Sequence, residues 1–533
     1  MKLNTDSNNP LHTAGSHLPF WVDSCEPIAY SKLAENKTTD VVVVGGGISG
    51  LTVAYCLCKA GKKVVLVEDG YIGSGETGRT TAHLVTALDD RYYDLERMFG
   101  EENTSLIAGS HRAAIDFVER IVNDENIECQ FDRVDGYLFL HPSDKADSLE
   151  RELEATRKAG LPVDLLPIQL AGSEVKALRF KDQAQFHPLR YLKGLCSAII
   201  SMGGEIYTDT HAKDIDHTGI TTNEGLNVAA QHVVVATNSP VNNKYMMHLK
   251  QYPYRTYVIG AKIQKNALPK ALWWDTGNFE VNADIAPYHY VRTEPLDDTH
   301  DLLIVGGQDH PTGLAESEHI PEEKRYQLLE LWAREHFPQM ENIVYQWSGQ
   351  VMEPMDSLAY IGHNPLDRDN VFIVTGDSGN GITHGTIAGI LITDLICGRE
   401  NAWEKLYSPS RFKLFKAGKT FFKEFVGGFV SYLKTKPKHL DHTGLKELKR
   451  FEGKIIELDD EKLGAYRDEQ DDLHFVEVEC THLGCLVKWN NDEKSWDCPC
   501  HGSRFNYKGE VLNGPANTPL RHYAQHKDFL TNI

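Results

Sequence analysis

The sequence predicts an α/β protein into which an antiparallel sheet is inserted, followed by a small separate domain at the C-terminus. Short apolar runs, typical of strands buried on both faces, lie at 41–44, 64–67, 232–237 and 371–375. From Tyr252 to Gly307 polar and apolar residues alternate, which indicates antiparallel strands with one face in water. Four of the ten cysteines lie between Cys480 and Cys500, far from the other six.

Composition is that of an ordinary globular protein. The 533 residues suffice for about three or four domain-sized units, and 41% of them are apolar against 25% charged. The net charge of -21 argues against nucleic acid as a partner, since phosphate binding needs a basic surface. No apolar run reaches the length of a membrane span, and residues 1–21 show neither a signal peptide nor twin arginines. We therefore expect a cytoplasmic protein.

The segment from Asp40 to Asp69 has every part of a dinucleotide-binding unit. A buried strand leads through Gly45, Gly47 and Gly50, in GxGxxG spacing, into a helix and a second strand that ends at Glu68. The first glycine permits a tight turn, the second lets the backbone approach a pyrophosphate, and the third lets helix pack on strand. The helix N-terminus favours phosphate, and Glu68 is placed to accept ribose hydroxyls.

Two further segments rich in small residues are expected at the same site. Residues 73–83 form a loop directly after the second strand, and its backbone donors can approach a phosphate or a flavin ring. Residues 370–399 form a strand that passes through Gly376, Gly379 and Gly381 into a helix. The N-terminus of that helix would stabilise negative charge on an electron-rich group such as a reduced flavin.

These segments resemble the glycine oxidase and D-amino-acid oxidase-like family of FAD-dependent oxidoreductases. The resemblance covers about residues 38–400 and rests on VVVVGGGISGLTVAYCLCKAGKKVVLVED, GSGETGRTTAHL, HVVVATNS, LLIVGGQDH and VFIVTGDSGNGITHG. It implies FAD held by Gly45, Gly47, Gly50, Glu68, Ser74, Thr77, Arg79, Thr80, Gly376, Gly379, Asn380 and Gly381. Some relatives attach flavin through a histidine that matches nearer Thr80 than His83, so we expect non-covalent FAD.

The pattern divides the chain into four parts. An N-terminal extension (1–37) precedes the oxidoreductase (38–400), a linker (401–445) and the C-terminal domain (446–533). A Rossmann-like FAD-binding domain is expected from segments at about 38–90, 185–240 and 345–400. An α+β substrate domain with the antiparallel sheet is expected from segments at about 91–184 and 241–344.

The resemblance also implies a reaction, which is oxidation of a C–N bond in an amino acid or secondary amine by hydride transfer to flavin. A carboxylate substrate needs an Arg or Tyr clamp, and the inserted sheet offers Tyr254, Arg255, Tyr257, Tyr290 and Arg292. We predict Tyr257, Tyr290 and Arg292 as substrate contacts, against the alternative that each is an ordinary sheet residue. Only one dinucleotide fingerprint is present, so electrons are expected from an organic substrate and not from a nicotinamide.

The C-terminal segment CTHLGCLVKWNNDEKSWDCPCHGS carries two Cys-His pairs. One residue separates Cys480 from His482, and two separate Cys498 from His501. Such a set can bind zinc, but zinc leaves the two other cysteines of the segment unexplained.

The CTHLGC and CPCHGS boxes and the downstream GPA sequence resemble a Rieske [2Fe–2S] domain, which is a small all-β fold. The resemblance assigns one iron to two cysteines and the other to two histidines, namely Cys480, Cys498, His482 and His501. It also implies a disulfide between Cys485 and Cys500. We therefore prefer the cluster to zinc.

Phe505 stands where high-potential Rieske relatives have a tyrosine, whereas Ser503 matches their serine. Phenylalanine donates no hydrogen bond to a cluster sulfur, and fewer donors stabilise the reduced cluster less. We therefore expect a potential below that of respiratory relatives.

The linker contains a basic and aromatic segment, 411–438, with phenylalanines at helical spacing. A membrane-surface helix near the electron acceptor is one interpretation. A helix that packs its aromatic face between the two domains is the interpretation that we favour.

Together these patterns predict a dehydrogenase in which a small amine or amino acid reduces FAD. Single electrons then pass to the Rieske cluster and to an external one-electron acceptor. One alternative is a reductase or electron-transfer component that feeds an oxygenase, and another is a redox sensor without its own organic substrate.

Overall fold

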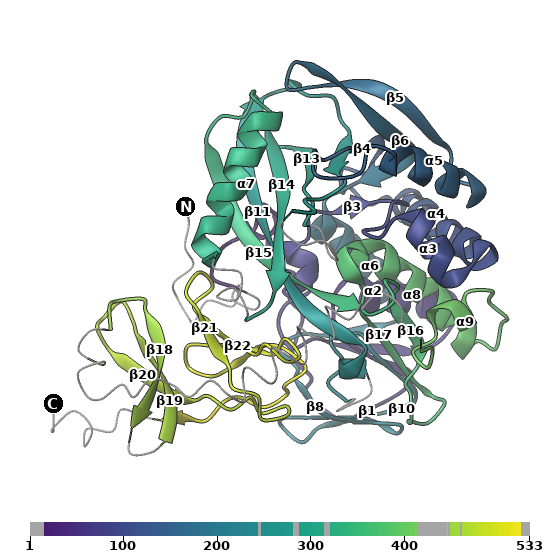
Figure 1. Ribbon diagram of the computed structural model, residues 1–533. Coiled ribbons are helices and arrows are strands. Elements are labelled where there is room, and N and C mark those ends of the chain that lie inside the picture. Colours follow the sequence, from purple (N-terminus) through teal and green to yellow (C-terminus); the bar gives the residue numbers. More distant parts are fainter. Residues whose placement is uncertain are drawn as a thin grey trace.

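The computed structural model describes residues 15–242, 247–280, 287–313, 320–412, 445, 448–458 and 461–523. Within these residues the strands form two large sheets and two small ones (Figure 1). The large sheets belong to the first three quarters of the chain, and the small sheets lie beside them as a C-terminal body.

The first large sheet is built on the β-branched runs of the sequence. Its strand order is β16-β17-β10-β1-β2-β7, with β9 paired to β10 and β8 paired to β9. The bounds are β1 (Lys37–Val44), β2 (Val64–Val67), β7 (Glu205–Tyr207), β8 (Ala212–Asp216), β9 (Gly219–Thr222), β10 (Asn227–Val235), β16 (Tyr360–His363) and β17 (Val371–Thr375). Strands β17, β10, β1, β2 and β7 run parallel to one another. Strand β16 pairs antiparallel with β17, and β9 pairs antiparallel with β10. Helices therefore have to connect the parallel strands and cover the sheet.

Some helices pack against this sheet and others against the second one, and their buried residues form one core. These helices are α2 (Ile48–Lys59), α3 (Tyr92–Phe99), α4 (Glu101–Asp124), α5 (Ser148–Lys158), α6 (Pro188–Ser201), α8 (Gly381–Ile396) and α9 (Glu404–Tyr407). The approach of α2 to the first turn requires glycine, since a Cβ at Gly50 would lie 1.9 Å from the carbonyl oxygen of Gly45. The short α1 (Phe20–Asp23) anchors the N-terminal residues through Trp21, which is fully buried.

The second large sheet is the inserted one. Its order is β15-β11-β14-β13-β12-β4-β6-β3, with β5 on β6. The bounds are β3 (His83–Leu84), β4 (Asp132–Phe139), β5 (Val163–Leu170), β6 (Ser173–Gln185), β11 (Gln251–Gln264), β12 (Leu272–Asp275), β13 (Tyr290–Pro295), β14 (His300–Pro311) and β15 (Ile343–Pro354). Helix α7 (Glu322–His336) crosses one face, as Figure 1 shows, and buries the apolar residues of that face. Most pairs are antiparallel, as the alternating pattern predicted, but β12 and β4 pair in parallel.

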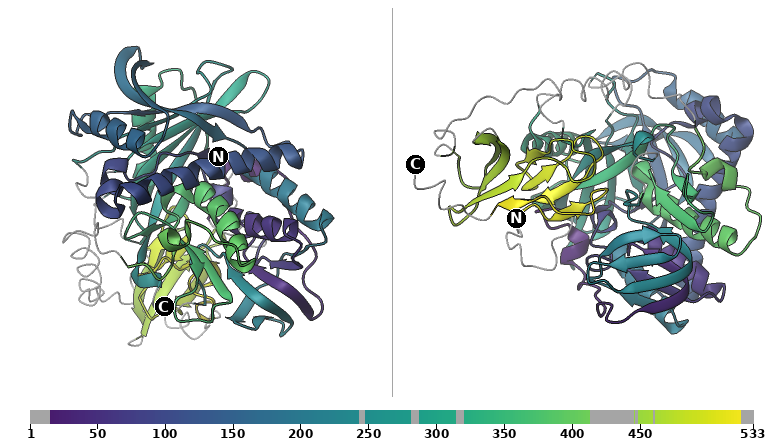
Figure 2. Two further views of the ribbon diagram at one scale, coloured as in Figure 1. Left: turned by 90° about the vertical axis from the view of Figure 1, so that its right-hand side faces the viewer. Right: turned by 90° about the horizontal axis from the view of Figure 1, so that it is seen from below.

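The C-terminal body consists of two four-stranded antiparallel sheets, β18-β19-β20-β25 and β21-β22-β23-β24. The bounds are β18 (Gly453–Leu458), β19 (Glu461–Arg467), β20 (Leu473–Glu477), β21 (Lys488–Asn490), β22 (Ser495–Asp497), β23 (Arg504–Asn506), β24 (Val511–Asn513) and β25 (His522–Tyr523). It projects from one side of the larger body (Figure 2, right). The predicted fold class, α/β with an inserted antiparallel sheet and a small all-β domain, is confirmed.

The segment 411–438 lies outside the described residues apart from Arg411 and Phe412. Its two interpretations therefore stay predictions. Among the helices that the structure describes, none is both long and apolar enough to span a bilayer.

Candidate active site and cluster site

A cavity of about 510 Å³ lies between the two large sheets and reaches the C-terminal body. One end is lined by the start of α2 and by Glu68 at the end of β2. Its other walls come from Thr256 and Val258 of β11 and from residues 377–382. Residues of and after β24 also line it, so two separately folded parts of the chain enclose one space.

The α2 end of the cavity fits a dinucleotide phosphate. Gly45 has φ 111°, and a Cβ there would lie 2.4 Å from the carbonyl oxygen of Ala236, so only glycine allows this turn. Gly47 is the N-cap of α2, which directs the free N–H groups of the helix to the cavity. Glu68 accepts hydrogen bonds from the backbone N–H groups of Gly46 and Gly70, and burial raises its pKa.

Most of the residues predicted to hold FAD line this cavity, namely Gly45, Gly47, Glu68, Ser74, Thr77, Arg79, Thr80, Gly379, Asn380 and Gly381. Gly50 and Gly376 lie outside the lining and act through the backbone. Gly50 permits the contact of α2 with the turn, and Gly376 has φ 66° where β17 leaves the sheet. The positive end of α8, which begins at Gly381, also faces the cavity.

The three predicted substrate contacts lie in different places. Tyr290 lines the cavity, and its hydroxyl is 2.6 Å from Thr256 Oγ1. Arg292 lies deeper and is fully buried, where it donates to the carbonyl oxygens of Ala82 and Phe186 and pairs with Glu294.

Tyr257 lies on the opposite face of β11 from the cavity. Residues alternate between faces along a strand, so Thr256 and Val258 line the cavity while Arg255 and Tyr257 point away from it. The hydroxyl of Tyr257 is 3.0 Å from Nε2 of His310, in the core beneath α7. Tyr254 is also buried outside the cavity lining.

Among the polar cavity residues that the sequence did not predict are Asp89, Tyr288, Asp309 and Glu353. They come from separate segments and belong to no motif, so their only signal was their position near predicted strand ends. Burial and the charge of Asp89 raise the pKa of Asp309 to about 7 and that of Glu353 to about 8.

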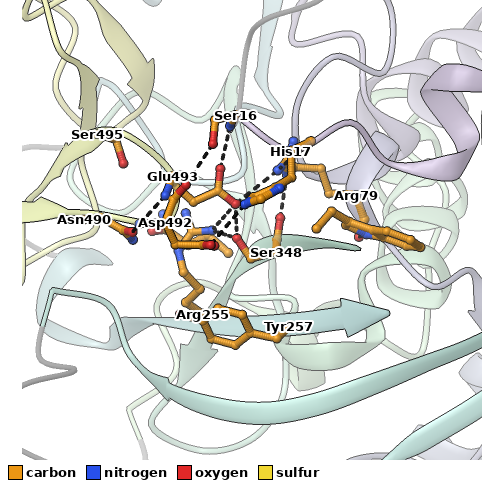
Figure 3. A network of polar contacts seen from close by, with 12 residues as sticks. Ser16, His17, Arg79, Arg255, Tyr257, Ser348, Asn490, Asp492, Glu493 and Ser495 are labelled. Carbon is orange, nitrogen blue, oxygen red and sulfur yellow. Dashed lines mark hydrogen bonds and ion pairs between the residues drawn. The ribbon is translucent and has the colours of Figure 1, made fainter. Parts of the chain in front are cut away.

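The tip of the β21–β22 hairpin inserts into the larger body (Figure 3). Glu493 accepts hydrogen bonds from Ser348 Oγ and from the backbone N–H of Ser16, the latter at 2.6 Å. It also pairs with Arg79, at 3.3 Å, and with Arg255, at 3.7 Å. Burial by itself raises the pKa of Glu493, but the charges of Arg79 and Arg255 outweigh burial, and the pKa is lowered.

Asp492 adds contacts to the same joint. Its Oδ1 lies 3.0 Å from Nε2 of His17, and its Oδ2 accepts a hydrogen bond of 3.1 Å from Tyr326. Burial lowers the pKa of His17, but the hydrogen bond and charge of Asp492 outweigh burial and raise it. The hairpin tip therefore joins the C-terminal body to Arg79 in the cavity wall.

The four predicted cluster ligands lie together in the C-terminal body. The thiols of Cys480 and Cys498 are hydrogen-bonded, and the rings of His482 and His501 are 5.1 Å apart between centroids. Burial and the charge of His482 lower the pKa of His501 to about 4, which keeps its imidazole neutral as a metal ligand requires. Two thiols beside two imidazoles fit a cluster with one Cys₂ iron and one His₂ iron.

The predicted disulfide between Cys485 and Cys500 is present, with an S–S distance of 2.08 Å. It joins the two loops that carry the ligands. Cys498 is nearby, with its sulfur within 4.8 Å of both disulfide sulfurs.

Side chains of the larger body reach the ligand loops. His248, in a single turn of 3₁₀ helix η2 (Met247–Leu249), packs its ring 4.6 Å from that of His482 and 5.6 Å from that of His501. Gln350 of β15 lines the cavity and donates from Nε2 to the carbonyl oxygen of Gly502, at 2.9 Å. The cavity wall and the ligand loops are thus in direct contact.

Comparison with known proteins agrees with both sites. The family model described as FAD dependent oxidoreductase (DAO) matches residues 40–395, and that of the Rieske [2Fe-2S] domain matches residues 442–524. A protein of Bacillus subtilis strain 168 named as a Rieske 2Fe-2S iron-sulfur protein, YhfW, is 34% identical, over 94% of this chain and 96% of its own. The gamma-glutamylputrescine oxidoreductase of Escherichia coli K12 is 25% identical, over 76% of this chain and 94% of its own.

Solved structures show the same fold for the larger body. Glycine oxidase from Geobacillus kaustophilus superposes with a TM-score of 0.58 at 21% identity, over 71% of this chain and all of its own. L-Proline dehydrogenase from P. horikoshii gives 0.57 at 19% identity, over 71% of this chain and 98% of its own. The chain belongs to the DAO family of FAD-dependent oxidoreductases and carries a C-terminal Rieske [2Fe–2S] domain.

Proposed function

We propose that the protein is a dehydrogenase that oxidises the C–N bond of an amine or amino acid at the FAD site. The electrons taken from the substrate would then pass one at a time through the Rieske cluster to an external acceptor. The named activity of the E. coli relative on gamma-glutamylputrescine supports an amine substrate.

The observation that carries this proposal is the contact between Gln350 and Gly502. Gln350 lines the cavity, and Gly502 directly follows the ligand His501, so one side chain links the cavity wall to the cluster loop. A cluster held so close to the flavin cavity is well placed to receive electrons from it.

Each part of the chain has a role in this reaction. FAD, when bound, would supply a hydride acceptor for the carbon beside the nitrogen, and the cluster would supply a carrier of single electrons. The start of α2, Glu68 and the loop around Thr77 would hold the dinucleotide. The start of α8 would stabilise negative charge on the reduced ring. Tyr290 is proposed to contact the substrate, because it is the predicted contact that lines the cavity.

The test is anaerobic mixing of the purified holoprotein with a panel of amines and amino acids. Flavin bleaching is followed by absorbance, and cluster reduction by electron paramagnetic resonance. We expect one class of compound to reduce both centres in sequence. Reduction by NADH and by none of these compounds would favour the reductase alternative.

The mode of FAD attachment has a separate test. Both ring nitrogens of His83 lie near hydrogen-bond partners, at 3.0 Å from Thr81 Oγ1 and 3.2 Å from the carbonyl oxygen of Val291. We propose non-covalent FAD, which acid precipitation should release into the supernatant. Flavin that stays with the precipitate would contradict this.

A further inference from the structure

Three carboxyl groups gather on the wall of the cavity between the two large sheets. Asp89, Asp309 and Glu353 all line it, and the pKa values of Asp309 and Glu353 are each raised by burial and, in addition, by the nearby charge of Asp89. Aromatic rings stand beside them, because Tyr288, Tyr290 and Trp274 line the same cavity. Carboxyl groups with aromatic rings are the lining that a cationic ligand favours.

The hydrogen bonds of the three carboxyl groups differ. Asp89 accepts three, from Tyr288, Gly379 and Asn380. The single hydroxyl hydrogen of Ser378 goes either to Glu353, at 2.8 Å, or to Asp89, at 3.3 Å. Oδ1 of Asp309 is excluded from solvent and has no hydrogen-bond partner within the described part of the chain. A buried carboxyl oxygen without a partner is costly, and a ligand that donates to it removes that cost.

The arginines predicted as carboxylate clamps are bound elsewhere. Arg255 pairs with Glu493 at the hairpin tip, and Arg292 pairs with Glu294 beneath the loop at Ala82.

Two arginines do line the cavity, and both already have partners. Arg79 donates to the carbonyl oxygen of Ser348 and pairs with Glu493. Arg91 donates to the carbonyl oxygen of Asp275. Its charge also acts on the buried Glu152, where it offsets part of the rise in pKa that burial causes. Lysine is absent from the described residues that line the cavity.

We propose that the substrate is a cationic alkylamine whose ammonium group lies among Asp89, Asp309 and Glu353, and not an α-amino acid held by its carboxylate. This inference rests on the proposed function and names its substrate class. An alkylamine is protonated in neutral solution, so it arrives as the cation that this wall attracts.

The reaction balances in two steps. The bound ammonium R–CH₂–NH₃⁺ first gives one proton to a carboxylate oxygen of the wall, which leaves the neutral amine. The amine then loses a hydride from its carbon, with both electrons of the C–H bond, to the FAD of the proposed function. The product is the iminium R–CH=NH₂⁺, which water hydrolyses to an aldehyde and an ammonium ion.

The experiment uses the oxidised holoprotein and has two readouts. The first readout is the change in flavin absorbance when tetramethylammonium or acetate binds. Tetramethylammonium is a cation that is not oxidised in the proposed way, because its nitrogen carries no hydrogen. The second is the anaerobic rate of flavin bleaching with matched pairs such as butylamine and norvaline, or pyrrolidine and proline. We expect tetramethylammonium to bind more tightly than acetate, and each amine to bleach faster than its carboxylated partner by about tenfold or more.

The variant Asp309→Asn should weaken tetramethylammonium binding by about tenfold, because it removes a carboxylate charge from the wall that attracts the cation. Its matched control is Asp301→Asn, on the same strand but outside the cavity lining. Glu353→Gln provides a second variant in case Asp309→Asn does not fold, and the wild-type comparison of cation with carboxylate needs no variant.

The outcomes separate the two proposals. Tighter binding of acetate, or faster bleaching by amino acids than by their amine partners, would overturn the cationic substrate while leaving the C–N dehydrogenase intact. Bleaching by NADH and by no amine or amino acid would overturn the dehydrogenase and this inference with it.

Discussion

Gln350 of the cavity wall donates a hydrogen bond from Nε2 to the carbonyl oxygen of Gly502, across 2.9 Å. Gly502 follows the ligand His501, and a Cβ on Gly502 would lie 2.6 Å from Cβ of Pro253, so the ligand loop lies tightly on β11. The ligand loop is therefore held in one position against the oxidoreductase body, through contacts at the backbone itself.

Replacing Gln350 by Leu should slow electron transfer from flavin to cluster by about fivefold, the effect of about 1 kcal/mol from one lost hydrogen bond. Reduction of the flavin by substrate should keep its rate. Stopped-flow absorbance separates the two phases. Gln346→Leu on the same strand, outside the cavity lining, is the control. Equal slowing of both phases would assign Gln350 to the substrate step instead.

Replacing Glu493 by Gln should lower the free energy of unfolding by about 3 kcal/mol, because Arg79 and Arg255 keep buried charges without their partner. The urea midpoint measures this, with the exposed Glu510→Gln as control.

The same variant should change the acid limb of the stability curve. The pKa of Glu493 is lowered from its usual 4.5, so its stabilisation is full above pH 4.5 and is lost as pH falls below that value. Glu493→Gln should therefore lose less stability between pH 5 and pH 3 than the wild type. Parallel acid limbs would show that other groups dominate.

Replacing Phe505 by Tyr should raise the potential of the cluster. Phe505 is fully buried on β23, in the same apolar core as Cys480 and Cys498. A phenol hydroxyl at this position can donate to a cluster sulfur, and about 1 kcal/mol corresponds to a rise of about 40 mV for one electron. A redox titration followed by electron paramagnetic resonance measures the shift. An unchanged potential in a variant with an intact cluster would show that a hydroxyl at position 505 does not stabilise the reduced cluster.

Replacing Glu353 by Gln should stabilise the protein in the absence of substrate at pH 8 but not at pH 5. Burial, then the charges of Asp89 and Asp309, raise the pKa of Glu353 from 4.5 to about 8. The folded protein keeps this proton while the unfolded chain releases it, so stability falls as pH rises from 4.5 to 8. Gln carries no such penalty, and its melting temperature should exceed the wild type by about 2 °C at pH 8. An equal shift at both pH values would point to packing instead of ionisation.

The sequence alone was enough for the parts of this protein whose chemistry is local. The turn at Gly45 and the carboxylate of Glu68 lie within one βαβ unit, so their spacing along the chain already specifies their place in space. The same holds for the ligand boxes around Cys480 and Cys498, and the disulfide implied by the Rieske resemblance is present.

Tertiary structure decided everything that depends on which faces meet. Alternation along β11 predicted two faces but could not say that Thr256 would line the cavity while Arg255 would meet Glu493, which is 238 positions away in the numbering of the chain. The carboxyl groups of Asp89, Asp309 and Glu353 likewise come together only through sheet packing, because no local spacing relates them. Sequence motifs reflect contacts between residues that are close in the chain. The carboxyl groups of the cavity wall and the joint at Glu493 depend on contacts between residues that are far apart in the chain.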